Sequence, residues 1–220
     1  MVFISNYKIV YKGGTSETEA KKSKFIAHIS PANTEEEAIS FINEVNKKHY
    51  DASHNCTAYI IGKNNEITRW NDDGEPSQTA GLPMLNVLLG EELHNVVAVV
   101  TRYFGGTLLG TGGLVRAYSD AVKEGIKSCV IIEKQLGKII HLTMDYTSLG
   151  KIQYILSEEQ VPIVDTTYTD VVEMTYIDPN PESKKIEKQL LEATSASIKI
   201  IPKEQVYFSN YNGKLLLFDS

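Results

Sequence analysis

An almost uninterrupted apolar run, NVVAVVTRYF at residues 95–104, restricts the possible folds of this chain more than any other feature. A strand that is apolar on both sides is typical of the interior of a sheet whose two faces are both covered. The run leads into a glycine-rich stretch, GGTLLGTGG at 105–113, and then into apolar residues at helical spacing. We therefore predict a strand, a tight turn and a helix to about Lys127, with these side chains facing the core: Leu114, Ala117, Tyr118, Ala121 and Val122.

The remainder of the first half mixes strands with helices, as expected for an α+β fold. Thr34 and Glu37 form a capping box before an amphipathic segment, so a helix is predicted there. In order along the chain, alternation and helical spacing predict a strand at 7–12, a polar loop at 13–23, a strand at 24–30, a helix at 34–48, a hairpin around 63–65 and a helix from Pro83.

The second half has a different order, β-α-β-β-α-β, which is typical of the ferredoxin-like split βαβ fold. Its predicted segments are a strand at 138–146, a helix after Ser148, a hairpin within 161–177, a helix at 181–193 and a strand at 197–208. Residues 133–138 are predicted to be a linker. The expected domains are residues 1–132, residues 137–208 and a C-terminal tail at 209–220, where Asn212-Gly213 favours a hairpin turn.

Composition and charge exclude several classes of function. The net charge is −6, so the chain is no general nucleic-acid coat, and any such contact needs a local patch. Two cysteines, Cys56 and Cys129, make no disulfide framework and suit a reducing compartment. No apolar run is long enough to span a membrane and no signal peptide is evident, so we expect a cytoplasmic protein without a membrane partner. Nothing in the sequence indicates an oligomeric state.

The arginines are concentrated in one region. Only three of the 22 basic residues are arginine, namely Arg69, Arg102 and Arg116, and no lysine occurs between Asn64 and Val122. The planar guanidinium binds carboxylate or phosphate in two places, which a lysine cannot do. Two interpretations stay open: the arginines contact an anionic ligand, or they pair with carboxylates of the chain itself and stabilise the fold.

The glycines of 105–113 suit an anion site at the entrance to a helix. Backbone N–H groups can approach a ligand closely there, and a helix N-terminus carries positive potential. The stretch lacks the ending of a P-loop and the last glycine of a dinucleotide fingerprint. Alternatively, the glycines only permit tight turns and close packing. The residues assigned to this candidate surface for an anion, a nucleic acid or a partner are Arg69, Arg102, Tyr103, Gly105, Gly106, Gly110, Gly112, Gly113 and Arg116.

The stretch NDDGEPSQTAG at 71–81 combines three carboxylates with turn-forming residues. The carboxylates could hold Mg²⁺, but Mg²⁺ usually needs a phosphate as well, and Asx side chains also bond their own backbone in turns. We interpret the stretch as a structured loop, tied to one of the arginines, that organises a surface shared with residues 102–116. The residues assigned to the loop are Asp72, Asp73, Gly74, Glu75 and Thr79.

His54 and Cys56 share one face of the predicted strand and are a conceivable zinc pair. Two further ligands at suitable spacing are missing, so we expect a buried cysteine and a histidine at the strand edge instead. Ser77 and Thr79 lie near carboxylates but have no evident base. We therefore assign no metal ligand, no cofactor and no catalytic residue.

Three stretches together resemble the IMPACT family, in particular its bacterial branch, called YigZ: KSKFIA at 22–27, the stretches HNCTAYIIG and NDDGEPSQTAGLPML within 54–85, and VVTRYFGGTLLGTGGLVRAYSDA at 99–121. The resemblance implies an N-terminal domain like domain 2 of a ribosomal small-subunit protein, with helices packed on one face of a sheet. The second half resembles the small C-terminal domain of bacterial members, which is similar to a ferredoxin-like domain of elongation factor G.

Eukaryotic members of that family regulate translation. The resemblance therefore implies a binding or regulatory protein linked to translation, with RNA, the ribosome or a translation-associated protein as its partner. One alternative is an enzyme that acts on a phosphorylated small molecule, with Mg²⁺ held by the 72–75 loop. Another is a scaffold without a ligand. Because no lysine and no convincing base accompany the glycine-rich stretch, we expect binding rather than catalysis.

Overall fold

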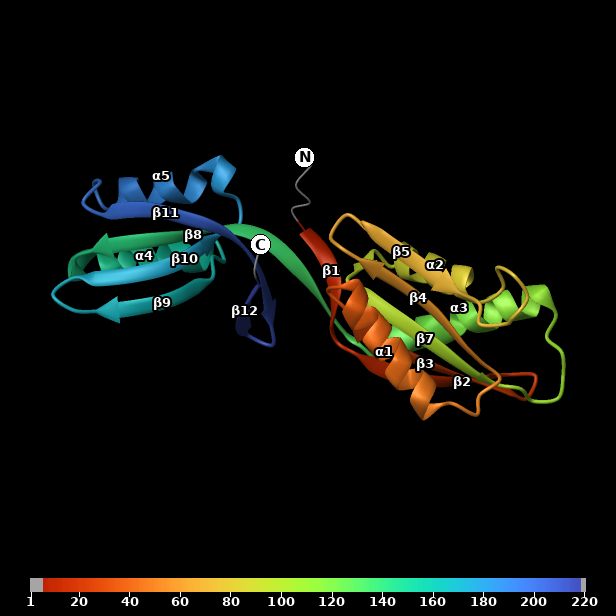
Figure 1. Ribbon diagram of the computed structural model, residues 1–220. Coiled ribbons are helices and arrows are strands. Elements are labelled where there is room, and N and C mark those ends of the chain that lie inside the picture. Colours follow the sequence, from red (N-terminus) through yellow and green to blue (C-terminus); the bar gives the residue numbers. More distant parts are fainter. Residues whose placement is uncertain (1–5, 219–220) are drawn as a thin grey trace. The chain divides into compact units, whose positions relative to one another are not determined.

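The computed structural model describes residues 6–218, and the chain divides into two compact units between Glu133 and Lys134 (Figure 1). This boundary lies inside one long strand, β8 (Val130–Met144). Residues 133–138, which are predicted to be a linker, therefore form part of a continuous strand. Their backbone is held in extended form because residues 135–138 pair with β11 (Lys199–Tyr211) in an antiparallel ladder. No helix among the described residues is long and apolar enough to cross a membrane.

The first unit is built on a five-stranded antiparallel sheet in the order β2-β3-β7-β4-β5. The strands are β2 (Gly14–Ala20), β3 (Ser23–Pro31), β4 (His54–Ile61), β5 (Ile67–Asn71) and β7 (Val96–Tyr103). The apolar run of the sequence is the central strand β7, and every residue from Val96 to Val100 is completely buried.

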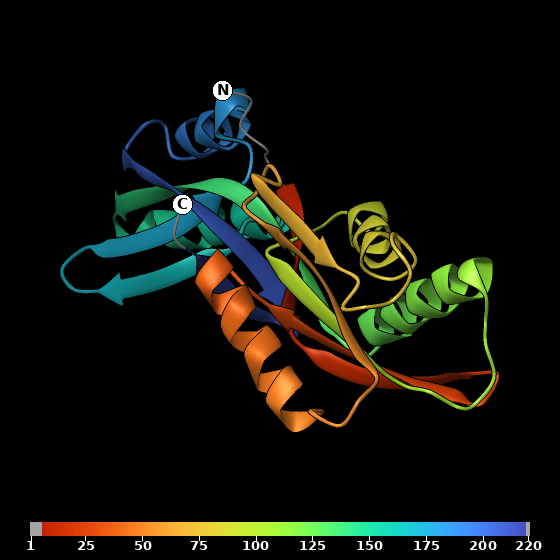
Figure 2. The ribbon, with the colours of Figure 1, turned by 45° about the vertical axis from the view of Figure 1, so that its right-hand side comes forward.

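Helices cover both faces of this sheet. Figure 2 shows α1 (Glu35–Lys48) on one side, with α2 (Gly81–Gly90) and α3 (Thr111–Lys127) on the other. Side chains of β7 alternate between the two layers: Ala98 packs with α2 and α3, and Val97 packs in the cluster under α1. The implied arrangement with all helices on one face is therefore wrong for this chain. The reason lies in β7 itself, which needs apolar cover on each side.

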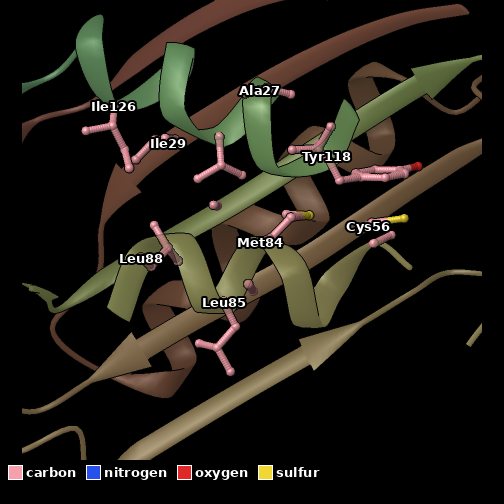
Figure 3. Packing of buried hydrophobic residues seen from close by; sticks show 14 of the residues in the cluster. Ala27, Ile29, Cys56, Met84, Leu85, Leu88, Tyr118 and Ile126 are labelled. Atoms are coloured by element: carbon pink, nitrogen blue, oxygen red, sulfur yellow. The ribbon is translucent and has the colours of Figure 1, made fainter. Parts of the chain in front are cut away.

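The larger core of this unit lies under α2 and α3. Figure 3 shows Met84, Leu85 and Leu88 of α2 beside Tyr118 and Ile126 of α3. The five residues predicted to face inward from α3 are all buried. One half of the predicted capping box forms in α1, because Thr34 Oγ1 accepts from the Glu37 N–H at 3.2 Å, while the Glu37 carboxylate accepts from the N–H of Asn33 at 2.7 Å.

The segment predicted as a polar loop, 13–23, is mostly the edge strand β2. It pairs along its whole length with β3, from Gly14↔Ile29 to Ala20↔Ser23. Lys21 and Lys22 form the turn with positive φ angles of 45° and 67°. An edge strand with polar residues on both faces has no apolar alternation, so its sequence resembles a loop. A further strand, β1 (Asn6–Lys12), pairs in parallel with the short β6 (Leu93–His94).

The second unit has the element order that the sequence predicts. After β8 come α4 (Tyr146–Glu158), β9 (Ile163–Tyr168), β10 (Val172–Asp178), a 3₁₀ turn (Pro181–Ser183), α5 (Lys185–Ala193), β11 and β12 (Lys214–Phe218). Its antiparallel strands lie in the order β9-β10-β8-β11-β12. Both helices pack in one apolar cluster with β8 and β10. The hairpin at Asn212-Gly213 joins β11 to β12, so the segment from 209 onward begins inside a strand.

Candidate ligand pocket at the start of helix α3

A pocket of about 550 Å³ lies where the 71–81 loop, the end of β7 and the start of α3 come together. Its polar lining consists of Ser53, His54, Glu75, Arg102 and Thr111. Its apolar lining consists of Pro76, Phe104, Leu108, Leu109 and Leu114. The two stretches that the sequence singled out, the acidic loop and the glycine-rich helix entrance, thus form opposite parts of one cavity.

A buried ion pair joins the 71–81 loop to the end of β7. Arg102 Nη1 lies 2.6 Å from Glu75 Oε1, and the side chains are only 6% and 3% exposed. The Tyr118 hydroxyl donates to the same carboxylate oxygen at 2.8 Å, so α3 is tied to the loop as well. The guanidinium lies between two aromatic rings, 5.5 Å from the centroid of Phe25 and 5.6 Å from that of Phe104. Arg102 is therefore held in one place from several sides.

The other two acidic side chains of the loop, Asp72 and Asp73, accept hydrogen bonds from backbone N–H groups. Asp72 Oδ1 accepts from the N–H groups of Ala80 and Gly81, at 3.1 and 2.8 Å, and Oδ2 accepts from Gln78 N–H at 2.7 Å. Since Ala80 has no capping side chain, Asp72 performs that role for α2 from a distance. The neighbouring Asp73 Oδ2 accepts from Asn55 N–H at 2.6 Å. The loop is fixed by these bonds, as its turn-forming composition suggested.

The three carboxylates of the loop do not converge on one point, because each is bound to different partners. Thr79, also assigned to the loop, donates its hydroxyl to the Pro76 carbonyl at 2.6 Å. Within residues 6–218, no group of three or more His, Cys, Asp or Glu side chains is placed to hold a metal ion. The alternative of Mg²⁺ held by the 72–75 loop is therefore not supported by this geometry.

His54 and Cys56 both contact the loop and do not form a metal pair. His54 Nδ1 donates to the Asp73 carbonyl at 2.7 Å, which leaves Nε2 3.9 Å from Glu75 Oε2. Cys56 Sγ donates to the Asp72 carbonyl at 3.0 Å. Burial raises the pKa of the Cys56 thiol and of the Tyr118 hydroxyl, so both groups stay protonated and act as donors.

The glycines of 105–113 have different roles, since Gly105 permits close packing and Gly110 lines the pocket. A Cβ on Gly105 would lie 2.0 Å from the carbonyl carbon and oxygen of Lys22, so only glycine fits against the β2–β3 turn. Gly110 is the N-cap of α3 with φ 73°, and it leaves the helix without a side-chain cap. Gly106 lies in the connecting loop, while Gly112 and Gly113 belong to the first turn of α3.

Of the nine residues assigned to this surface, only Arg102 and Gly110 line the pocket. Gly105, Gly106, Gly112 and Gly113 are near them in the chain, and the other three lie elsewhere. Arg69 is exposed on β5, with Nε 3.7 Å from Glu35 Oε1. Tyr103 points to the opposite face of the sheet from Arg102, because neighbours in a strand alternate, and its hydroxyl donates to Asp51 Oδ1 at 3.1 Å. Arg116 is an exposed residue of α3 whose Nε donates to the carbonyl of its own helix four residues earlier, at 3.3 Å. Neither Arg69, Tyr103 nor Arg116 lines the pocket.

The sequence assigns no site role to most of the lining, namely Ser53, His54, Pro76, Phe104, Leu108, Leu109, Thr111 and Leu114, nor to Tyr118, which contacts Glu75. Tyr118 was expected inside the core, but its hydroxyl bond to Glu75 depends on a contact between distant segments. Phe104 follows the central strand directly, and an aromatic side chain beside a glycine-rich turn is the one signal that could have pointed to it.

Comparisons with known proteins match both units. The Impact N-terminal domain family matches residues 21–126, and a domain of unknown function designated DUF1949 matches residues 142–197. The IMPACT family member YvyE of Bacillus subtilis is 43% identical over 205 residues, covering 93% of this chain and 94% of that protein. The IMPACT family member YigZ of Escherichia coli is 32% identical, covering 85% of this chain and 93% of that protein.

A solved crystal structure of a hypothetical protein is also similar, with a TM-score of 0.59 and 31% sequence identity. The match covers 92% of this chain and 99% of that chain. It therefore extends over both units of the present chain.

Proposed function

Because this chain belongs to the IMPACT family, we propose that it is a binding protein that acts in connection with translation and takes its ligand in the pocket beside α3. The partners that we consider are RNA, the ribosome and translation-associated proteins. The pocket is the observation that carries the proposal, since it joins the two stretches that resemble the family most.

The contacts around the pocket support recognition rather than a purely structural role for the two stretches. Arg102 and Glu75 neutralise each other, so the lining is held rigidly without a net charge from this pair. The start of α3 then supplies positive potential at the pocket, because Gly110 and Thr111 are part of the lining. A rigid pocket with polar groups on one side and apolar side chains on the other is the usual form of a ligand site.

The proposal is tested with the full chain in cells, by ultraviolet crosslinking followed by recovery of bound RNA, ribosomes and translation factors. Leu108 lines the pocket and is 81% exposed, so Leu108→Glu changes the pocket without removing a core contact. Leu217→Glu makes the same change on β12, outside the pocket, and is the matched control. We expect recovery of one of these partners with the wild type and the control, and reduced recovery with Leu108→Glu.

Two results would overturn parts of the proposal. Recovery of neither RNA, ribosomes nor translation factors in repeated experiments with folded protein would rule out the link to translation. Equal recovery with the wild type and Leu108→Glu would show that the partner binds outside the pocket.

A further inference from the structure

We propose that the pocket binds a nucleotide unit, with a phosphate on the N-terminus of α3 and a base against the ring of Phe104. This inference rests on the proposed function and names the ligand of the same site. Three independent features of the pocket lead to it: free backbone donors, a buried arginine with an unused N–H, and an exposed aromatic ring.

The first feature is the start of α3, a helix of 17 residues. Its first intrahelical bond runs from Leu114 N–H to the Gly110 carbonyl at 2.9 Å, so the N–H groups of 111–113 have no acceptor within the helix. No side chain caps this helix end by accepting from its N–H groups. No acidic residue in the first turn balances its positive potential either. A Cβ added at Gly112 would meet nothing within 4 Å, so the first turn of α3 has room for an added side chain.

The second feature is Arg102. Its Nη1 donates to Glu75 and its Nη2 to Ser23 Oγ at 3.4 Å, but its buried Nε has no hydrogen-bond partner among the residues of the described range. A buried donor left without an acceptor costs about 1–3 kcal/mol, so such groups are usually satisfied by something. Arg102 also lines the pocket, but Nε itself has less than 1 Å² of exposed surface, so an acceptor of a ligand reaches this N–H only when the side chain shifts toward the pocket.

The third feature is Phe104, which lines the pocket and is 50% exposed. The guanidinium of Arg102, on one side, restrains the ring. An exposed and restrained aromatic ring is a stacking surface for a base, and such stacking does not depend on the base identity. Leu108 and Leu109 extend the apolar side of the pocket beside it.

Charge also favours this ligand. Glu75 is the acidic residue of the lining, and its Oε1 already accepts from Arg102 and Tyr118. A phosphate at the start of α3 therefore meets the positive end of the helix and a carboxylate whose charge is balanced. A nucleotide offers a phosphate and a flat apolar face in one molecule, which matches the two sides of the pocket.

The test uses the full chain with two probes, adenosine 5′-monophosphate and a short single-stranded RNA of mixed sequence. Binding is measured by calorimetry for the nucleotide and by fluorescence anisotropy for the labelled RNA, at several salt concentrations. Binding of the nucleotide alone points to a free nucleotide as the source of the ligand chemistry. Binding of RNA with little binding of the nucleotide points to a chain.

Two variants test the two halves of the site. Gly112→Asp adds a carboxylate to the first turn of α3, where its charge would repel a phosphate bound at the same helix end, and the open space and the helix dipole let the helix tolerate it. Gly150→Asp adds the same charge to α4, where an added Cβ also meets nothing within 4 Å. Phe104→Ala removes the stacking ring, and Tyr50→Ala removes an exposed aromatic side chain outside the pocket.

We expect Gly112→Asp and Phe104→Ala each to weaken binding about tenfold or more, as loss of a phosphate contact or of one stacked base would do. The two control variants should bind as the wild type does. If RNA is recovered from cells but both pocket variants bind it as tightly as the controls do, the inference is wrong and the proposed function stands. If neither probe binds folded protein, the inference is also wrong, and recovery of ribosomes or translation factors still decides the proposed function separately.

Discussion

Glu75 and Arg102 meet at 2.6 Å in the interior of the first unit, although 27 positions separate them in the chain. Their ion pair connects the 71–81 loop to the central strand of the sheet, and Tyr118 extends the connection to α3. The shape of the pocket thus depends on two opposite charges that lie almost entirely out of water.

Removing one member of this ion pair should lower the stability of the protein strongly. We expect Glu75→Ala to lower the free energy of unfolding by about 3–5 kcal/mol, because it leaves the Arg102 guanidinium buried and unpaired. The double variant Glu75→Leu with Arg102→Met removes both charges and should recover much of that loss. Urea denaturation followed by circular dichroism measures each free energy.

An exposed ion pair on the same unit is the control. Lys24 Nζ and Glu17 Oε1 lie 2.9 Å apart with both side chains about half exposed, so Glu17→Ala should change stability little. If Glu75→Ala and Glu17→Ala cost the same, the buried pair does not hold the loop in the way described.

The stability of the first unit should depend on pH through His28. Burial, with contributions from nearby His49 and Lys48, lowers the pKa of His28 from 6.5 to about 4. Between these values the unfolded chain binds the proton and the folded chain does not, so stability rises with pH from about 4 to 6.5 and is lost as the pH falls through this range. Above pH 6.5 this contribution no longer changes.

The measurement is the melting temperature at closely spaced pH values for the wild type and His28→Asn. Carboxylates also titrate below pH 6, so the difference between the two curves isolates the histidine. We expect that difference to shift in favour of His28→Asn as the pH falls. Parallel curves across the whole range would contradict the prediction.

Substitution by alanine should change the stability in opposite directions at two glycines near the start of α3. In Gly105→Ala the new Cβ collides with the backbone at Lys22, so we expect a loss of about 1–3 kcal/mol or more. In Gly112→Ala the Cβ meets open space in a helix, so we expect no loss and a gain of up to about 1 kcal/mol. Thermal denaturation of both variants checks the prediction, and equal effects would contradict it.

Asp72 should stabilise the loop only by accepting hydrogen bonds from backbone N–H groups. Asp72→Ala removes the acceptor of three N–H bonds, and bonds to a charged group contribute about 1.5–3 kcal/mol each, so we expect a loss of at least about 2 kcal/mol. Hydrogen exchange should become faster at the amides of Gln78, Ala80 and Gly81. Added Mg²⁺ should leave the melting temperature of the wild type unchanged. If Mg²⁺ raises it in the wild type but not in Asp72→Ala, the loop binds the metal and this prediction is wrong.

Local signals in the sequence were sufficient for much of the fold. The inward face of α3, the Thr34–Glu37 box and the order of elements in the second unit all follow from spacing or from contacts three residues apart. By contrast, the sequence of β2 predicts a loop because its residues are polar on both faces. Its pairing with β3 decides its structure, and that pairing is not visible in the segment alone.

In the candidate site, too, some features follow from local sequence and others depend on contacts between distant segments. The distribution of arginine indicates Arg102 as a candidate, and the acidic composition of the loop indicates Glu75. The sequence does not show which of the three arginines contacts the loop, because that depends on the face of the sheet to which each side chain points. Arg102 points toward the loop, and its neighbour Tyr103 points to the opposite face. The unused Nε of Arg102 is likewise a property of the packed interior, so no pattern in the sequence could show it.

The bare start of α3 has a practical consequence for protein engineering. A carboxylate in the first turn of a helix commonly adds about 0.3–1 kcal/mol, so a screen for heat-resistant variants should readily select one at 111–113. The same added charge would repel the phosphate that we assign to this end of the helix. Selection for heat resistance and selection for ligand binding therefore act in opposite directions on these residues, and a directed-evolution experiment on this protein should score both.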